Sequence, residues 1–177
     1  MKRLHCVPNL NELNEYVKLA EEYDMAFEYN EFFSPAVLCD KKMNDDIMSK
    51  YAALGREGGI DTLHGAFYDV NVASDDPEVF AVSNKRIMQS MENAKAIKAR
   101  GVIFHTNYIA NFSLESYRET WLNRNEEYFR KLAAKYPDID IYAENMFDED
   151  PELLAKLCER MKDVKNFGAS FILFHFS

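Results

Sequence analysis

The sequence predicts an α/β fold, an incomplete TIM (β/α)8-type barrel with about five β/α units and a sixth strand in a parallel sheet. β-prone segments alternate strictly with segments of helical periodicity. Polar residues at corresponding strand positions recur at intervals of 36, 41, 39 and 31 residues, at Glu28, His64, His105, Glu144 and His175. The rival architecture, a doubly wound sheet, usually has a glycine-rich loop after its first strand, but that turn here reads VPNLNE.

Six segments predict the strands because they are rich in aromatic and β-branched residues and are bounded by turn residues. They are residues 2–8, 25–33, 60–72, 102–108, 138–147 and 169–176. The second, MAFEYNEFF, is the most aromatic, and the fourth, VIFHTNY, begins with an apolar run. The sixth, ASFILFHF, is apolar almost to the last residue of the sequence.

Five segments between these strands have apolar residues at helical spacing. The helices are expected within residues 9–24, 41–55, 75–101, 114–136 and 152–164. Asn9 and Glu12 can form a capping box, Gly55 suits a left-handed helix end, and Asp76 followed by Pro77 predicts a capped start. Further cap or stop residues are Gly101, Ser113, Pro137, Asp150 and Pro151.

Composition limits the classes of function. The 177 residues are expected to form one domain, 1–177, and the net charge of −9 disfavours nucleic acid as a partner. The three cysteines lie far apart without a C-x-x-C pair, as in reduced cytoplasmic thiols. The sequence shows no signal-peptide core and no apolar run of about 18 residues, so we expect a cytoplasmic protein that does not contact a membrane.

Polar residues near the strand ends predict the functional site. In a parallel barrel the carboxyl ends of the strands form the catalytic face, so these side chains should converge there. Histidines and carboxylates in one cavity suit a divalent metal, or proton transfer next to one. The candidates are Glu28 or Glu31, His64, His105, Glu144 with Asn145, and His175.

Several of these residues also have a structural interpretation. A carboxylate such as Glu144 is costly to bury without a partner, which favours a functional role. Glu28 and Glu31 are equally well explained as solvated groups. His5 is more easily explained as a structural histidine, and Trp121 as a helix-packing residue.

The residues between about 25 and 168 resemble the xylose isomerase-like barrels, specifically the sugar phosphate isomerase/epimerase group. The resemblance is carried by TLHGAFYDVN, by DDPEVFAVSNKRIMQSMENAKAIKARGVIFHTNY, by IYAENMFDEDPELLAKLCERM and by NFG. Each motif alone is weak, but their order and spacing are specific.

The resemblance implies an eight-stranded barrel with a divalent metal, Mn²⁺, Mg²⁺ or Zn²⁺, and a sugar or sugar phosphate as substrate. The implied reaction moves a proton at a carbon next to a carbonyl. Glu144 is expected to be catalytic and to bind the metal together with His175. His64, His105 and Asn145 are expected to bind the substrate.

The sequence departs from the family at its end. After NFG the family continues to an Asp-x-Gly-His motif, which aligns here with Ile172, Phe174 and His175, so only the histidine is kept. The seventh and eighth units do not follow, and we therefore expect weak or no metal binding and impaired catalysis. Six strands leave two sheet edges, so we expect a homo-oligomer that covers them.

Two other functions stay open at this stage. One is a non-catalytic barrel remnant or interaction protein. The other is a relative of the apurinic-site endonuclease branch, in which histidines at the positions of His64 and His105 bind zinc. The net charge of −9 and the total of four histidines argue against the endonuclease.

Overall fold

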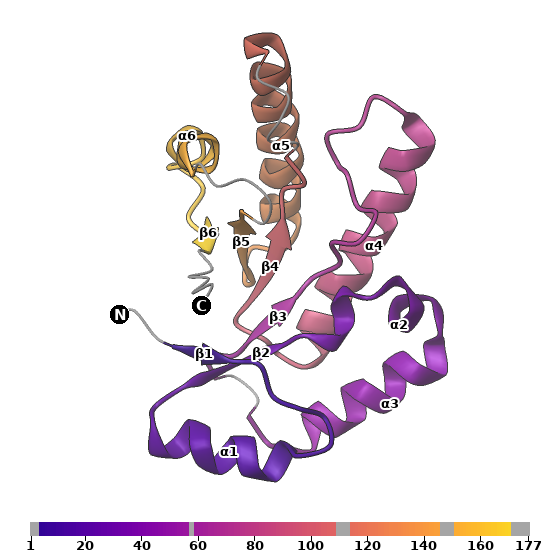
Figure 1. The fold of residues 1–177 in the computed structure, drawn as a ribbon, viewed down its shortest axis with the longest axis vertical. Coiled ribbons are helices and arrows are strands. Elements are labelled where there is room, and N and C mark those ends of the chain that lie inside the picture. The colour runs from indigo at the N-terminus through magenta and orange to yellow at the C-terminus, as the bar shows by residue number, and fades with distance from the viewer. Residues whose placement is uncertain (1–3, 57–58, 109–113, 146–150, 171–177) are drawn as a thin grey trace, which may run out of the picture. The chain divides into compact units, whose positions relative to one another are not determined.

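The computed structural model describes residues 4–56, 59–108, 114–145 and 151–170 (Figure 1). Two compact units make up the chain. Unit 1 comprises residues 1–68 and 86–102, and unit 2 comprises residues 69–85 and 103–177. Helix α4 and strand β4 each have residues in both units.

The α/β class and the strand order of an incomplete TIM-type barrel are confirmed. Six parallel strands follow one another along the sheet in chain order, β1 to β6, with helices between them. The strands are β1 His5–Cys6, β2 Ala26–Tyr29, β3 Thr62–His64, β4 Gly101–His105, β5 Asp140–Glu144 and β6 Phe167–Ser170. The helices are α1 Leu13–Glu22, α2 Pro35–Cys39, α3 Lys41–Ala52, α4 Pro77–Ala96, α5 Glu115–Lys135 and α6 Glu152–Arg160, and η1 is a short 3-10 helix at Glu31–Phe33.

Unit 1 is built on β1, β2 and β3. His5 is in register with Ala26 in the first pair of strands, and Glu28 with Thr62 in the second. The predicted second strand is too long, because the chain turns into η1 after Tyr29. Helix α2 was not predicted from the sequence. Ser34 caps it, because the Ser34 side chain accepts a hydrogen bond from the Ala36 N–H.

Helix boundaries show which of the capping predictions were correct. Asp76 caps α4, and Gly55 has the predicted positive φ of 65°. Asn9 is not the cap of α1, because it forms a turn before Leu13 in which its side chain accepts from the Asn11 N–H. Gly101 does not end α4, because that helix stops at Ala96 and Gly101 begins β4. Ser113 and Asp150 lie outside the described residues.

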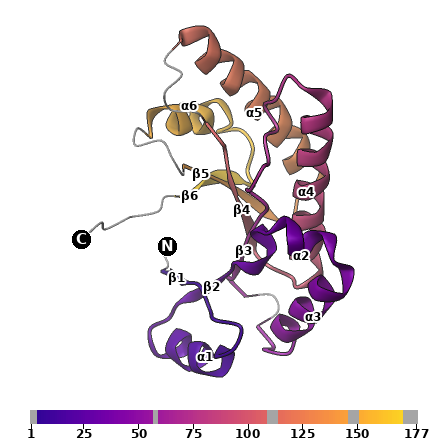
Figure 2. The same cartoon turned by 45° about the vertical axis from the view of Figure 1, so that its right-hand side comes forward.

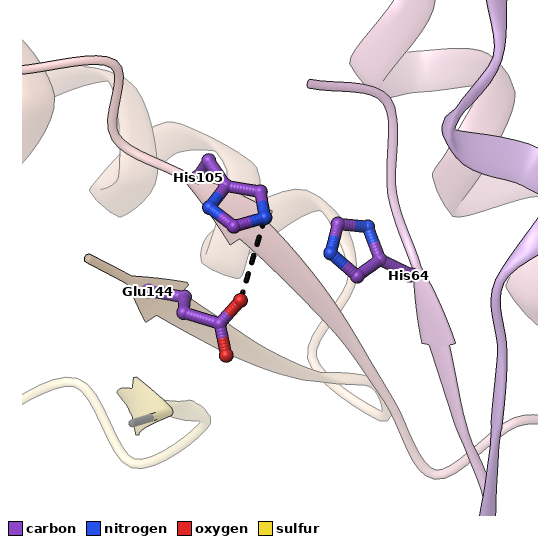
Figure 3. Close-up of side chains that lie close together, drawn as sticks. All are labelled: His64, His105 and Glu144. Atoms are coloured by element: carbon purple, nitrogen blue, oxygen red, sulfur yellow. Dashed lines mark ion pairs between the residues drawn. The ribbon is translucent and has the colours of Figure 1, made fainter. Parts of the chain in front are cut away.

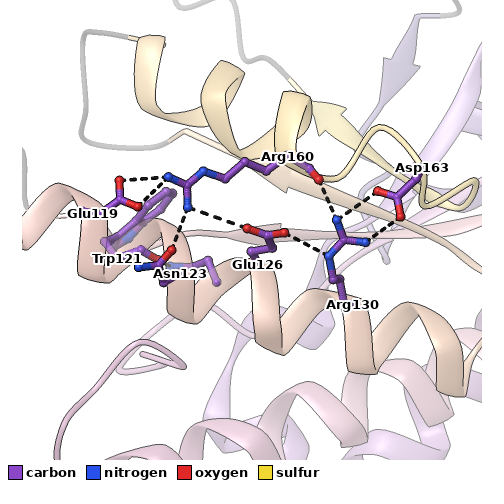
Figure 4. Close-up of polar contacts among 8 residues, drawn as sticks. Glu119, Trp121, Asn123, Glu126, Arg130, Arg160 and Asp163 are labelled. Atoms are coloured by element: carbon purple, nitrogen blue, oxygen red, sulfur yellow. Dashed lines mark hydrogen bonds and ion pairs between the residues drawn. The ribbon is translucent and has the colours of Figure 1, made fainter.

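Unit 2 contains the β5–β6 pair, whose strands lie side by side in both views (Figures 1 and 2). Helix α5 buries a stripe that includes Trp121, Phe129 and Leu132. On its outer side, Arg130 and Arg160 connect α5 to α6 and the segment after it through hydrogen bonds and ion pairs (Figure 4). Among the described residues, no helix is long and apolar enough to cross a membrane.

The sixth strand begins earlier than predicted. β6 covers Phe167–Ser170, and residues 171–177, including His175, lie outside the described part of the chain. Its start is fixed by Asn166, whose side-chain N–H groups donate to the carbonyls of Ala133, Tyr136 and Ile139. These bonds attach the start of β6 to the end of α5, and they place Ser170 beside Glu144 in the strand register.

Candidate metal centre

The centre of the site in unit 2 is a buried contact between His105 and Glu144. These residues end β4 and β5, and their side chains are only 2% and 3% exposed. His105 Nε2 lies 3.4 Å from Glu144 Oε2 (Figure 3). Ser170 Oγ, at the end of β6, donates to the other carboxylate oxygen, Oε1, at 2.9 Å. Three consecutive strand ends therefore contribute to one polar cluster.

The backbone around His105 is held in place by two hydrogen bonds. The N–H of Thr106 donates to the carbonyl of Glu144 at 3.3 Å, which fixes the end of β4 beside the end of β5. The indole N–H of Trp121 donates to the carbonyl of Thr106 at 3.3 Å. Trp121 is therefore a packing residue of α5, as expected, but it also positions the residue that follows His105.

The donor atoms fit a divalent metal ion. Histidine nitrogens and carboxylate oxygens bind Zn²⁺ at about 2.0–2.2 Å, and two such atoms on one tetrahedral ion lie about 3.4 Å apart. This matches the observed separation of His105 Nε2 and Glu144 Oε2, which is long for a direct hydrogen bond. Mixed nitrogen and oxygen donors suit Zn²⁺ or Mn²⁺ better than Mg²⁺, which prefers oxygen ligands.

His64 is the corresponding residue of unit 1. It is the last residue of β3, it is buried, and its Nδ1 lies 3.0 Å from the carbonyl oxygen of Gly65. When Nδ1–H donates to that oxygen, Nε2 carries a lone pair, as a metal-binding or substrate-binding imidazole requires. Burial lowers the pKa of His64, against a smaller opposing effect of the Gly65 hydrogen bond, which favours the neutral ring.

The other predicted site residues differ in their surroundings. Asn145 follows Glu144 and is half-buried, and His175 lies outside the described residues. Glu31 accepts a hydrogen bond from the hydroxyl of Tyr51 on α3, which gives it a structural partner. Glu28 is half-buried, and burial raises the pKa of its carboxyl group.

Two residues that hold the candidate site in place, Ser170 and Trp121, were not predicted to do so from the sequence. Ser170 was missed because the predicted sixth strand began at residue 169, which placed Ser170 at the start of that strand and not beside Glu144. The positioning role of Trp121 follows from its bond to the Thr106 carbonyl, and no local sequence pattern indicates such a bond.

Solved structures share this fold at low sequence identity. The TTHB071 protein from Thermus thermophilus, soaked with ZnCl2, has a TM-score of 0.68 and 20% identity, over 96% of this chain and 65% of that one. A D-tagatose 3-epimerase-like protein has a TM-score of 0.65 and 22% identity, over 96% and 64%. A D-psicose 3-epimerase, in the presence of D-fructose, has a TM-score of 0.67 and 13% identity, over 96% and 63%.

The chain thus spans slightly less than two thirds of the length of these structures. At such identities the likeness shows the fold alone. No protein of curated function matches the chain in sequence. A family model, however, matches residues 17–177, which is most of the chain. Since this match covers the strands that carry His64, His105 and Glu144, the chain belongs to the xylose isomerase-like TIM barrel family.

Proposed function

We propose that this chain supplies the metal-binding and proton-transfer part of a sugar isomerase or epimerase site. The observation that carries the proposal is the buried 3.4 Å contact between His105 and Glu144 at the ends of neighbouring strands. Family membership supports the reaction class, because the chain matches the xylose isomerase-like barrels. The proposed substrate is a sugar with a carbonyl group.

His64 is the corresponding candidate in unit 1. It ends β3, and β3 precedes β4 in the strand order, so the three residues end three consecutive strands. Parallel strands present their carboxyl ends at one face of a barrel. Each of the three buried residues offers one ligand atom, a ring nitrogen or a carboxylate oxygen. The proposed metal ligands of unit 2 are therefore His105 and Glu144, with Asn145 and His175 as further candidates, and His64 is the candidate of unit 1.

The chemistry follows from these side chains. A divalent ion, when bound, polarises the carbonyl of a sugar. The Glu144 carboxylate would take a proton from the carbon next to the carbonyl and deliver it to the former carbonyl carbon, while a hydroxyl proton passes between the two sugar oxygens, so that ketose and aldose are interconverted. Epimerisation would need a second acid–base group on the opposite face of that carbon. Ser170 fixes the orientation of that carboxylate by donating to Oε1, and the low exposure of the pair keeps water away.

Metal titration of the purified chain tests the proposal. We expect Zn²⁺ or Mn²⁺ to give saturable heat in isothermal calorimetry. Glu144→Gln keeps the side-chain volume but removes the charge, and should weaken the affinity by about 10- to 100-fold or more. The matched control is Glu127→Gln, an exposed acid on α5 paired only with Lys131 in the described contacts, which should bind like the wild type. Equal affinity in Glu144→Gln and wild type would refute the assignment.

Turnover needs a separate measurement. A metal-loaded chain that converts a ketohexose into its C3 epimer or aldose isomer, detected by chiral chromatography, supports an enzyme. Metal binding without any conversion supports the other hypothesis, a non-catalytic member of the family. Loss of conversion in Glu144→Gln, with the fold retained by circular dichroism, assigns the proton transfer to this residue.

We also propose that the chain self-associates through its sheet edges. In the described strand order, β1 and β6 each have one neighbour, and an unpaired edge favours pairing with another chain. Sedimentation velocity at micromolar concentration should show a dimer or larger species. A folded monomer at that concentration would contradict the proposal.

A further inference from the structure

Two residues that follow strands in unit 2 have a left-handed backbone. Asp69, in the segment after β3, has a φ of 56°, and Asn107, two residues after His105, has a φ of 50°. Positive φ is unfavourable for a residue with a side chain, although aspartate and asparagine tolerate it better than most. Such a conformation persists where surrounding contacts maintain it, and it is concentrated at functional sites.

Helix ends explain the other non-glycine residues with positive φ. In the described part of the chain these are Asp24 after α1 and Lys98 after α4, with φ of 51° and 54°. In each case the N–H of the next residue donates to the carbonyl five residues before it, at 2.9 Å. Both residues are therefore the left-handed member of a Schellman motif. Asp69 and Asn107 follow strands, so this explanation does not apply to them.

A hydrogen bond connects these two turns within unit 2. The side-chain N–H of Asn107 donates to the carbonyl of Val70, the residue after Asp69. We call this bond, together with the left-handed backbone of Asn107, the strand-end clamp. Val70 is only 4% exposed. The clamp therefore joins the end of β4 to a buried part of the segment that precedes α4.

That segment is itself held firmly in unit 2. The N–H of Asn71 donates to Ser83 Oγ on α4 at 2.8 Å, and Ser83 is 0% exposed. Arg124 on α5 donates to the carbonyl of Ala73 at 2.7 Å. The Val70 carbonyl is therefore a fixed acceptor, and a side chain bonded to it is fixed as well.

We propose that the strand-end clamp positions the His105 imidazole at the candidate metal centre, which makes Asn107 a positioning residue. Thr106 is already held by Glu144 and Trp121, and Asn107 fixes the direction in which the chain continues. The ring of His105 lies 3.4 Å from a Glu144 oxygen, and a metal site tolerates only small displacements of its ligands. The inference rests on the proposed function and adds a residue to its site.

Asn107→Gly tests the clamp, because glycine keeps the left-handed backbone and removes the amide donor. Groups that orient metal ligands typically contribute about 10- to 100-fold in affinity. Asn107 acts through the backbone, so we expect calorimetry with Zn²⁺ alone to give an affinity about 3- to 10-fold weaker than in the wild type. The matched control is Lys98→Gly, which replaces a left-handed residue of unit 1 and should bind Zn²⁺ like the wild type.

NMR of ring-labelled histidine measures the position of the imidazole without a metal. The chain has four histidines, so the ring signals can be assigned individually. In Asn107→Gly the His105 signals should broaden or double, because the ring adopts more than one orientation, while those of His64 stay unchanged. In Lys98→Gly all ring signals should match the wild type. A residue that serves folding alone would lower the free energy of unfolding without either effect.

Unchanged His105 signals, or wild-type Zn²⁺ affinity, in folded Asn107→Gly would overturn the inference. The Glu144→Gln titration separates this result from the proposed function. If Glu144→Gln binds weakly and Asn107→Gly binds like the wild type, only the clamp is rejected. If Glu144→Gln binds like the wild type, the proposed function fails, and the His105 ring signals still decide whether the clamp positions the imidazole.

Discussion

Asp61 and Glu144 are both buried carboxylates, but the two units surround them differently. Asp61 precedes β3, at its amino end, and accepts four hydrogen bonds: one from the Phe27 N–H, one from the Tyr29 hydroxyl and two from the Arg56 guanidinium. Glu144 ends β5, at its carboxyl end, where the described contacts are Ser170 and the imidazole of His105. One carboxylate has a permanent cation beside it, and the other faces an imidazole.

This difference separates a structural carboxylate from the one that we propose to be functional. Burial alone would raise the pKa of Asp61, but the bonds from Arg56, Phe27 and Tyr29 outweigh it, and the pKa lies below its ordinary value. Its interactions leave little capacity for a ligand. Glu144 faces the imidazole of His105, a type of side chain that commonly binds metals. In TIM-type barrels the amino ends of the strands serve stability and the carboxyl ends serve catalysis.

The largest effect should come from Asp61→Asn. The substitution leaves the half-buried Arg56 guanidinium without its buried counter-charge and should lower the free energy of unfolding by about 3–5 kcal/mol. Stability from Asp61 is present above its ordinary pKa of 3.8 and is lost as the pH falls through the lower folded value. The free energy of unfolding, measured by urea denaturation from pH 7 to pH 3, should therefore fall less with decreasing pH in the variant than in the wild type.

The comparison predicts opposite results for the two carboxylates in the metal titration. Asp61→Asn, studied where it is still folded, should keep the wild-type metal affinity, while Glu144→Gln should lose it. A variant at Asp61 that remains as stable as the wild type would show that its four hydrogen bonds contribute little net stability. A loss of metal affinity in folded Asp61→Asn would contradict the assignment of stability to the amino ends of the strands and of metal binding to their carboxyl ends.

Trp121→Phe should have the next largest effect. The change removes the N–H donor to the Thr106 carbonyl and part of a buried ring, which should cost about 1–3 kcal/mol in unfolding free energy. Because Thr106 follows His105, we also expect the metal affinity to fall, by less than in Glu144→Gln. Calorimetry at a temperature where the variant is folded measures this. If stability falls while metal affinity stays unchanged, Trp121 serves packing alone.

Much of the fold was predictable because local signals agree with the parallel sheet. Short stretches of sequence indicate both the alternation of strands and helices and the capped start of α4 at Asp76 and Pro77. The start of the sixth strand was predicted too late because it depends on Asn166, which bonds to carbonyls about 30 residues earlier. A non-local anchor of this kind leaves no periodic pattern.

The positions of His105 and Glu144 at neighbouring strand ends were predictable for the same reason, while their functional role stays a prediction. His105 and Glu144 end β4 and β5, where the polar residues stood out from apolar strands. No local pattern indicates that Ser170 binds Glu144, since a serine after a glycine and an alanine is common in loops. Nor could the sequence separate Glu31 from Glu28, because the hydroxyl partner of Glu31, Tyr51, lies on a different element.

Glu28→Gln should raise the free energy of unfolding at pH 7, whereas Asp61→Asn and Trp121→Phe lower it, and the change should be smaller. Burial raises the pKa of Glu28 above its ordinary 4.5, so the folded state holds this proton more tightly than the unfolded state. The resulting loss of stability sets in as the pH rises through 4.5 and is complete above the raised value. Glutamine removes it, so the variant should be more stable than the wild type at pH 7 and equal to it near pH 4. A less stable variant at pH 7 would mean that ionised Glu28 has a stabilising partner.

The smallest effect should come from Glu126→Gln on the outer face of α5. Glu126 lies between two guanidinium groups, 3.1 Å from Arg130 Nε and 3.7 Å from Arg160 Nη1 (Figure 4). Solvent and salt screen such pairs, and Arg130 and Arg160 keep other carboxylate partners in Asp163 and Glu119. We expect a slight loss of thermal stability in low salt that disappears at about 1 M NaCl. If the loss of thermal stability persists at about 1 M NaCl, the Glu126 contacts are not screened as exposed ion pairs should be. The distinction between these surface contacts and the buried contacts of Asp61 would then be weaker.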